Sequence, residues 1–225
     1  MHFYKCRNYG NFAAQVDTPH TYRTLGQASE GTYSESGSKF LAFAWPVHDD
    51  ERVKQYRETL LKAHHKAVHV VWASRIGYDT VMERNSDDGE PSGSAGKPVL
   101  NVLRAHQLTN STILVVRYFG GKKLGIPGLI NAYRSAAEEA VNRAGIRIVT
   151  IFEHMQVTCA MADMQTVLHQ LNKAGARVNN STFEEICTFN ISIARERYEQ
   201  FQASVKDLWQ AQIHTLGNAD QPDTV

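Results

Sequence analysis

The stretch STILVVRYFGGKKLGIPGLINAYR runs from Ser111 to Arg134 and contains a strand, a glycine-rich loop and the start of a helix. Its first nine residues, STILVVRYF, are rich in β-branched and aromatic side chains and form the strongest strand signal in the chain. Four glycines follow the strand. From about Leu129, apolar residues recur at helical spacing as far as Ala144, and Gly145 is a stop signal.

The residues before this stretch predict the other elements of a first domain. KFLAFAWPV predicts a strand that ends at Pro46, and VHVVWASRIG predicts another. Between them, Asp49 or Asp50 is positioned to cap a helix whose apolar residues keep helical spacing up to Ala67. PVLNVLRAH also has helical spacing.

The residues after Gly145 predict a simpler domain. IVTIFEHMQVTCA indicates one strand, followed by a helix capped by Asp163 and closed by Gly175. ARVNNSTFEE and EICTFNISIA indicate paired strands, Arg195 to Trp209 a second helix, and AQIHTL a last strand. The order β-α-β-β-α-β is typical of a ferredoxin-like domain. It holds no candidate catalytic cluster.

Composition places the chain among soluble globular proteins, with 42% hydrophobic and 21% charged residues. No apolar run approaches the roughly 18 residues of a membrane span, and Met1 to Thr21 lacks the apolar block of a secretory signal. We therefore expect a cytoplasmic protein with no membrane partner. Three cysteines without CxxC spacing predict neither a disulfide framework nor a zinc knuckle.

Charge is distributed unevenly along the chain. Residues 1–148 carry 19 lysines and arginines against 14 aspartates and glutamates, and residues 149–225 carry 5 against 9. The first part is therefore near +5 and the second near −4. This asymmetry favours two domains, of which the first meets an anionic partner. Ordinary scatter of surface charge is the alternative.

A polar loop, SDDGEPSGSAGKP, extends from Ser86 to Pro98. Its glycines permit backbone turns in which successive amides form an anion nest. Its carboxylates, Asp87, Asp88 and Glu90, offer oxygen ligands to a hard cation such as magnesium. They could equally pair with nearby lysines or keep a turn soluble. We expect no cofactor, with magnesium as the alternative.

A basic loop, RYFGGKKLGIPG, connects the central strand to its helix. Between Ile113 and Ala137 the chain has four cations and no carboxylate. Backbone amides and the positive end of the helix dipole favour phosphate at such a position. The glycine spacing does not fit GxGxxG, so a dinucleotide fingerprint is absent. A flexible crossover with solvated lysines is the alternative.

GSKFLAFAWPV, HVVWASRIG, SDDGEPSGSAGKPVL and VVRYFGGKKLGIPGLINAYRSA together resemble the IMPACT family, and in particular its bacterial YigZ-like branch. The resemblance implies an α+β fold. It implies a two-layer α/β first domain related to a small-subunit ribosomal protein domain, and a ferredoxin-like tail similar to a late domain of elongation factor G. We expect a poorly ordered extension at residues 1–21, domains at residues 22–147 and 148–218, and a tail at residues 219–225.

The resemblance also places the family signature on the two loops and on the strand that precedes them. We predict a phosphate-binding or nucleic-acid-binding set: Arg117, Gly120, Gly121, Lys122, Lys123, Gly125, Gly128 and Arg134. We predict a cleft wall opposite: His69, Asp87, Asp88, Gly89, Glu90, Ser92, Gly93, Gly96 and Lys97.

Eukaryotic members of the family resemble regulators of translation that restrain a nutrient-stress kinase. The first hypothesis is therefore a non-enzymatic, translation-associated regulatory protein that binds RNA or the ribosome through a glycine-rich basic cleft. The alternative is a magnesium-dependent enzyme on a small phosphorylated or nucleotide substrate, with the loop carboxylates as metal ligands or base. A third possibility is a module whose tail docks a protein. The sequence does not indicate an oligomeric state.

Overall fold

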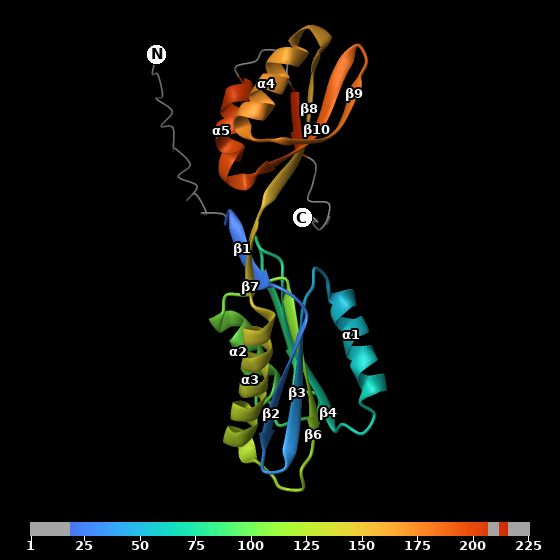
Figure 1. Cartoon of the computed structure of the whole chain (residues 1–225), viewed down its shortest axis with the longest axis vertical. Helices are drawn as coiled ribbons and strands as arrows, with labels where there is room; N and C mark the ends of the chain where they lie inside the picture. Colours follow the sequence, from blue (N-terminus) through green and yellow to red (C-terminus); the bar gives the residue numbers. More distant parts are fainter. Residues whose placement is uncertain (1–18, 207–211, 216–225) are drawn as a thin grey trace, which may run out of the picture.

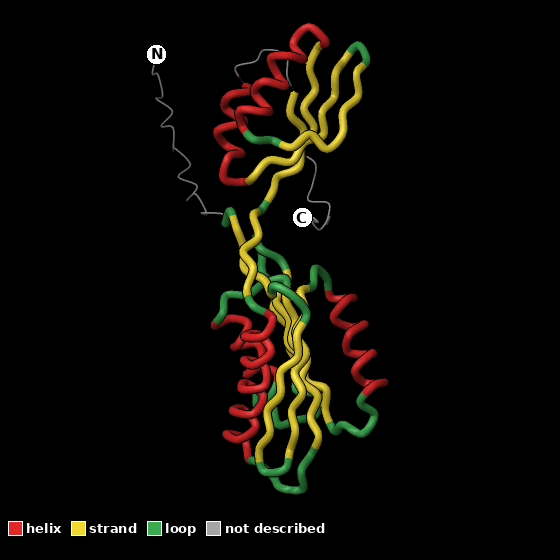
Figure 2. Tube along the Cα trace, in the orientation of Figure 1, coloured by secondary structure: helices red, strands yellow, loops and turns green. Residues whose placement is uncertain are grey.

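The computed structural model describes residues 19–206 and 212–215 (Figure 1). The chain forms two bodies joined by a narrow two-stranded ribbon (Figure 2). In the ribbon, β1 (Thr21–Leu25) pairs antiparallel with β7 (Ile146–Thr150). We call residues 29–144 the first unit and residues 152–215 the second unit.

The first unit is built on a five-stranded antiparallel sheet. Its strands are β2 (Ser29–Glu35), β3 (Ser38–Pro46), β4 (His69–Ile76), β5 (Met82–Ser86) and β6 (Ser111–Tyr118). The order across the sheet is β2-β3-β6-β4-β5, which places β6 at the centre. The predicted strands at β3, β4 and β6 are confirmed. The edge strands β2 and β5 were missed because their sequences, SEGTYSE and MERNS, are too polar to give a strand pattern.

Helices cover both faces of this sheet. The helices are α1 (Asp50–Ala63), α2 (Gly96–Ala105) and α3 (Gly125–Ala144). In Figure 1, α2 and α3 lie against one face and α1 lies against the other. Asp49 caps α1 as predicted, because its Oδ1 accepts the backbone N–H of Arg52 at 2.7 Å. The first unit therefore has three layers, and the prediction of two layers is wrong.

The central strands explain the third layer, because their apolar side chains point to both faces. On β3, Phe40 packs in the core beneath α2 and α3, whereas Phe43 packs with the cluster beneath α1. On β6, Val115 packs in the core beneath α2 and α3, and Val116 packs with the cluster beneath α1. A sheet that is apolar on both faces needs a helix layer on each.

The second unit has the predicted element order. Its elements are β8 (Phe152–Ala160), α4 (Met164–Ala174), β9 (Arg177–Phe183), β10 (Ile186–Ala194), α5 (Arg195–Lys206) and β11 (Gln212–Thr215). Its sheet has the order β11-β8-β10-β9 and is antiparallel throughout. Both helices pack on one face, over a core of its own that includes Met155, Phe189 and Phe201.

Two local predictions for this region are wrong: the uninterrupted strand and the Asp163 cap. The strand predicted over IVTIFEHMQVTCA is interrupted at Ile151, whose N–H donates to the carbonyl of His20 and whose carbonyl accepts the N–H of Arg195, both at 2.9 Å. The predicted domain boundary after residue 147 falls inside β7. Asp163 makes no capping hydrogen bond, because it belongs to a short 3-10 turn (Met161–Asp163) that runs directly into α4.

Arg195 connects the two units at the base of the ribbon. Its Nε donates to Glu153 of β8 at 2.5 Å, and its Nη2 donates to Asp79 of the first unit at 3.0 Å. The guanidinium also lies over the ring of Tyr78, 5.5 Å from its centroid. The junction therefore has polar contacts in addition to the strand pairing.

Some predictions lie outside the described residues: most of the extension at residues 1–21, the end of the helix predicted to Trp209, and the tail at residues 219–225. Among the helices that the structure describes, none is long and apolar enough to cross a membrane.

Candidate functional site

The loop between β5 and α2 is ordered by Asp87. One carboxylate oxygen accepts the backbone N–H groups of Ala95 and Gly96 at 3.0 and 2.8 Å, and the other accepts that of Gly93 at 2.8 Å. Burial acts to raise the pKa of Asp87, but the three N–H donors outweigh it and hold the pKa below its usual value. Asp87 therefore closes the loop and caps the first turn of α2.

We expect Asp87→Asn to lower the free energy of unfolding by about 1 to 3 kcal/mol at neutral pH, because an amide cannot satisfy the three partly buried N–H groups equally. A carboxyl whose pKa is depressed by folding stabilises the protein above its unfolded pKa, near 3.9, and loses that contribution as pH falls through the folded value. Urea unfolding at a series of pH values should show the difference from the unsubstituted protein shrinking in acid.

The control for this prediction is Glu58→Gln, which changes an exposed carboxylate that has no hydrogen bond or ion pair among the described residues. It should leave the free energy of unfolding within about 0.5 kcal/mol of the original. A deficit in Asp87→Asn that stayed constant down to the acid limit would show that the carboxylate charge is not what orders the loop.

Asp88 attaches the same loop to α1 and β4. One carboxylate oxygen accepts Nη2 of Arg57 at 2.8 Å, and the other accepts the backbone N–H of Val70 at 2.7 Å. Its backbone carbonyl lies 2.6 Å from Nδ1 of His69. Because a carbonyl oxygen only accepts, His69 carries a proton on Nδ1 and directs Nε2 toward Glu90, with 3.9 Å between Nε2 and Oε1.

Glu90 is the buried end of the loop. Its Oε1 accepts Nη1 of Arg117 at 2.6 Å and the hydroxyl of Tyr133 at 2.7 Å. The side chains of Glu90 and Arg117 are only 4% and 7% exposed. Burial and the hydrogen bond to Glu90 raise the pKa of Tyr133, so this phenol stays a neutral donor. The contacts join the loop, β6 and α3.

Strand register brings the partners of Glu90 together. Arg117 on β6 pairs with Phe40 on β3 and with His69 on β4, so the three residues form one row across the sheet. The Arg117 guanidinium lies 5.5 Å from the ring centroid of Phe40 and 5.6 Å from that of Phe119. Arg117 therefore contacts two aromatic rings as well as Glu90.

The three loop carboxylates thus all accept hydrogen bonds from protein donors. Among residues 19–206 and 212–215, no group of three histidine, cysteine or acidic side chains lies close enough to hold a metal ion. The magnesium hypothesis gains no support from this arrangement.

The two predicted loops face each other across a cavity of about 420 Å³, which we call the loop recess. Five predicted residues line it: His69, Glu90, Arg117, Lys123 and Gly125. Six residues that were not predicted also line it: Val68, Pro91, Phe119, Leu124, Ile126 and Leu129. The sequence signal that could have identified some of them was the presence of apolar residues within the basic loop, above all Phe119 directly after the strand.

Other predicted residues lie elsewhere. Gly93, Lys97 and Arg134 line a second cavity of about 510 Å³ between α2 and α3. Ser92 and Lys122 are exposed. Gly89 lies beside the His69 ring, and Gly96 begins α2 against Ser86. Gly128, in the first turn of α3, packs on Leu124, the residue before that helix. The predicted set is therefore divided between two surfaces.

Gly120 has a structural role. A Cβ at this position would lie 1.9 Å from the backbone carbon of Gly37, and the Gly120 N–H donates to Oγ of Ser38 at 3.1 Å. Its amide is therefore occupied by the β2–β3 turn. Gly121 has φ of 85° and open space where a Cβ would stand.

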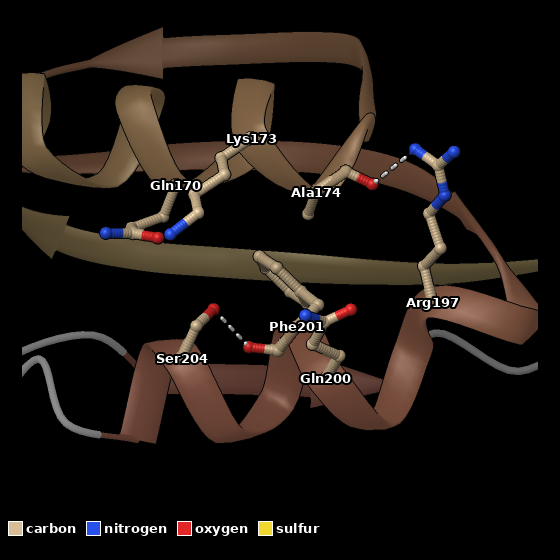
Figure 3. A pocket seen from close by; sticks show the side chains of 7 residues that line it. All are labelled: Gln170, Lys173, Ala174, Arg197, Gln200, Phe201 and Ser204. Carbon is tan, nitrogen blue, oxygen red and sulfur yellow. Dashed lines mark hydrogen bonds between the residues drawn. The ribbon is translucent and has the colours of Figure 1, made fainter.

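The second unit has a recess of its own, of about 440 Å³, between α4 and α5 (Figure 3). The ring of Phe201 lies between the helices, with Lys173 on α4 and Arg197 on α5 at the edges. Nη1 of Arg197 lies 3.5 Å from the carbonyl of Ala174. No residue of this recess belongs to the predicted site.

Residues 36–141, which contain both loops, match the family model described as the Impact N-terminal domain. The "IMPACT family member YvyE" of Bacillus subtilis is 28% identical over 84% of this chain and 87% of its own length. The "IMPACT family member YigZ" of Escherichia coli is 26% identical over 80% of this chain and 89% of its own length.

A solved structure titled "Crystal structure of an hypothetical protein" has the same fold, with a TM-score of 0.66 and 23% identity over 89% of this chain and 100% of that one. The loops and the sequence matches agree: residues 36–141 match the Impact N-terminal domain, and the chain is similar to bacterial members of the IMPACT family.

Proposed function

We propose that this protein is a non-enzymatic, translation-linked regulatory protein that binds RNA, free or in the ribosome, at the rim of the loop recess. The observation that carries the proposal is the position of Lys122 and Lys123. Lys123 lines the recess and Lys122 is the residue before it; both are exposed, and neither has an ion pair among the described residues. Unpaired lysines at the edge of a cavity are suited to RNA phosphates, which position a strand without reading its sequence.

Local electrostatics support the same assignment. Glu90 neutralises Arg117, so the free positive charge is that of the two lysines. α3 begins at Gly125 with no side-chain cap, and its dipole adds partial positive charge to the same rim. Similarity to the IMPACT family supports the link to translation, since its eukaryotic members resemble translational regulators. A protein partner on the ribosome is compatible with this role.

We expect Lys122→Ala/Lys123→Ala to weaken binding of a short single-stranded RNA about tenfold or more at moderate salt. Each phosphate contact releases counterions, so the slope of log affinity against log salt should fall by about 1 per lysine removed. Fluorescence anisotropy with a labelled oligonucleotide over a series of salt concentrations measures both quantities.

The matched control is Lys54→Ala/Lys173→Ala, which removes two exposed lysines of α1 and α4 and keeps the same net charge as the test variant. It should leave the salt slope unchanged. The proposal fails if the unsubstituted protein does not bind RNA at low salt and does not sediment with ribosomes, or if both double variants bind alike.

A further inference from the structure

Arg117, which lines the loop recess, has a hydrogen-bond donor without a partner among the described residues. Its side chain is 7% exposed. Nη1 is taken by Glu90, but Nε is buried and has no hydrogen-bond partner among the described residues. A buried donor left unpaired destabilises the protein, so an acceptor from a ligand would be stabilised there.

The walls of the recess are apolar and unusually open. Val68 and Phe119 are each 49% exposed, and Ile126 is 55% exposed. All three line the same cavity from different segments of the chain. Large apolar side chains gathered at one cavity mark a binding surface rather than ordinary scatter.

The charge of the Glu90–Arg117 pair restricts the class of ligand. Because Glu90 and Arg117 form a pair with no net charge, a phosphate placed beside the pair would approach a carboxylate and would lose its hydration without compensation. A neutral, flat group with a hydrogen-bond acceptor on its edge fits such a recess. Its faces would pack on the apolar walls, and its edge would accept a hydrogen bond from Nε of Arg117. An aliphatic side chain from a protein would leave Nε unpaired.

We propose that the loop recess holds one unpaired base of single-stranded RNA, stacked on Phe119 and hydrogen-bonded at its edge to Nε of Arg117. This inference rests on the proposed function, because Lys122 and Lys123 would hold the flanking phosphates at the rim. Single-stranded bases are free to leave the stack and pack on aromatic side chains, whereas paired bases in a helix are not.

The test compares a short uridine oligonucleotide with an abasic ribose-phosphate oligomer of the same length, using anisotropy and the full-length chain. The unsubstituted protein should bind the intact strand about tenfold more tightly, the usual effect of one stacked base. Phe119→Ala should abolish this difference, and Phe119→Trp should retain it and show fluorescence quenching by the base. Phe183→Ala, which removes another exposed phenylalanine, should change nothing.

Equal affinity of the unsubstituted protein for the two oligomers would overturn the base site, as would unchanged discrimination in Phe119→Ala. In both cases, sensitivity to Lys122→Ala/Lys123→Ala would still uphold the proposed function. If neither oligomer bound at low salt, the proposed function and the base site would fail together. Circular dichroism and urea unfolding of each Phe119 variant separate lost binding from lost folding.

Discussion

Glu90→Leu should lower the free energy of unfolding by about 3 to 5 kcal/mol, the usual cost of leaving one member of a buried ion pair without its partner. The substitution removes the acceptor of Arg117 and of the Tyr133 hydroxyl, both of which are buried. Urea unfolding followed by circular dichroism measures the change. Glu51→Gln disrupts an exposed ion pair with Lys54 and should cost no more than about 0.5 kcal/mol.

We expect the charge of Arg117 to account for most of this cost, and a double variant tests that expectation. Glu90→Leu/Arg117→Met replaces the ion pair by apolar side chains, so it should be more stable than Glu90→Leu alone. Recovery should be incomplete, because the Tyr133 hydroxyl still lacks its acceptor. Additive losses in the double variant would contradict the view that an uncompensated charge is the dominant effect.

Gly120→Ala should cost about 3 kcal/mol of unfolding free energy, at the upper end of the effects seen when a packed site is overfilled. The new Cβ would stand 1.9 Å from Gly37 C and 2.1 Å from Ser38 N, both main-chain atoms that cannot rotate away. The turn between β2 and β3 would have to separate from the end of β6. Thermal and urea unfolding both report this loss.

Gly121→Ala is the matched comparison in the adjacent residue. Its added Cβ meets nothing within 4 Å, so only the φ of 85° opposes the substitution, at about 1 kcal/mol. Equal losses at the two positions would show that Gly120 is present for its backbone angles rather than for the close approach. RNA affinity per folded molecule should be retained in both variants.

Several elements could be predicted from local sequence because one strong pattern dominated each. The continuous apolar run before Arg117 predicted the central strand, and the helical spacing up to Ala144 with Gly145 predicted the helix that follows. The edge strands β2 and β5 were missed because an edge strand with an exposed face needs no apolar alternation. Their pairing partners, which lie in other segments of the chain, specify them.

The candidate site was predictable in its segments but not in its chemistry. The sequence pointed to both loops and to their charged residues, yet Asp87, Asp88 and Glu90 were equally compatible with a metal site and with internal pairing. Sheet register answered this question for Glu90, because it places Arg117 beside His69 and Phe40 beneath the loop. No local pattern encodes which strands are neighbours.

The sequence by itself therefore determined the resemblance to the IMPACT family, the element order of the second unit and the two loops that carry the candidate site. Only the tertiary structure decided that helices cover both faces of the first sheet. It also decided that Gly120 allows a close approach of two backbone segments, and that the recess has apolar walls around an arginine whose charge is neutralised by Glu90. The physical reason is the distance along the chain over which each effect acts. Backbone preference and side-chain period act over a few neighbouring residues, whereas burial and charge compensation depend on atoms brought together from distant segments.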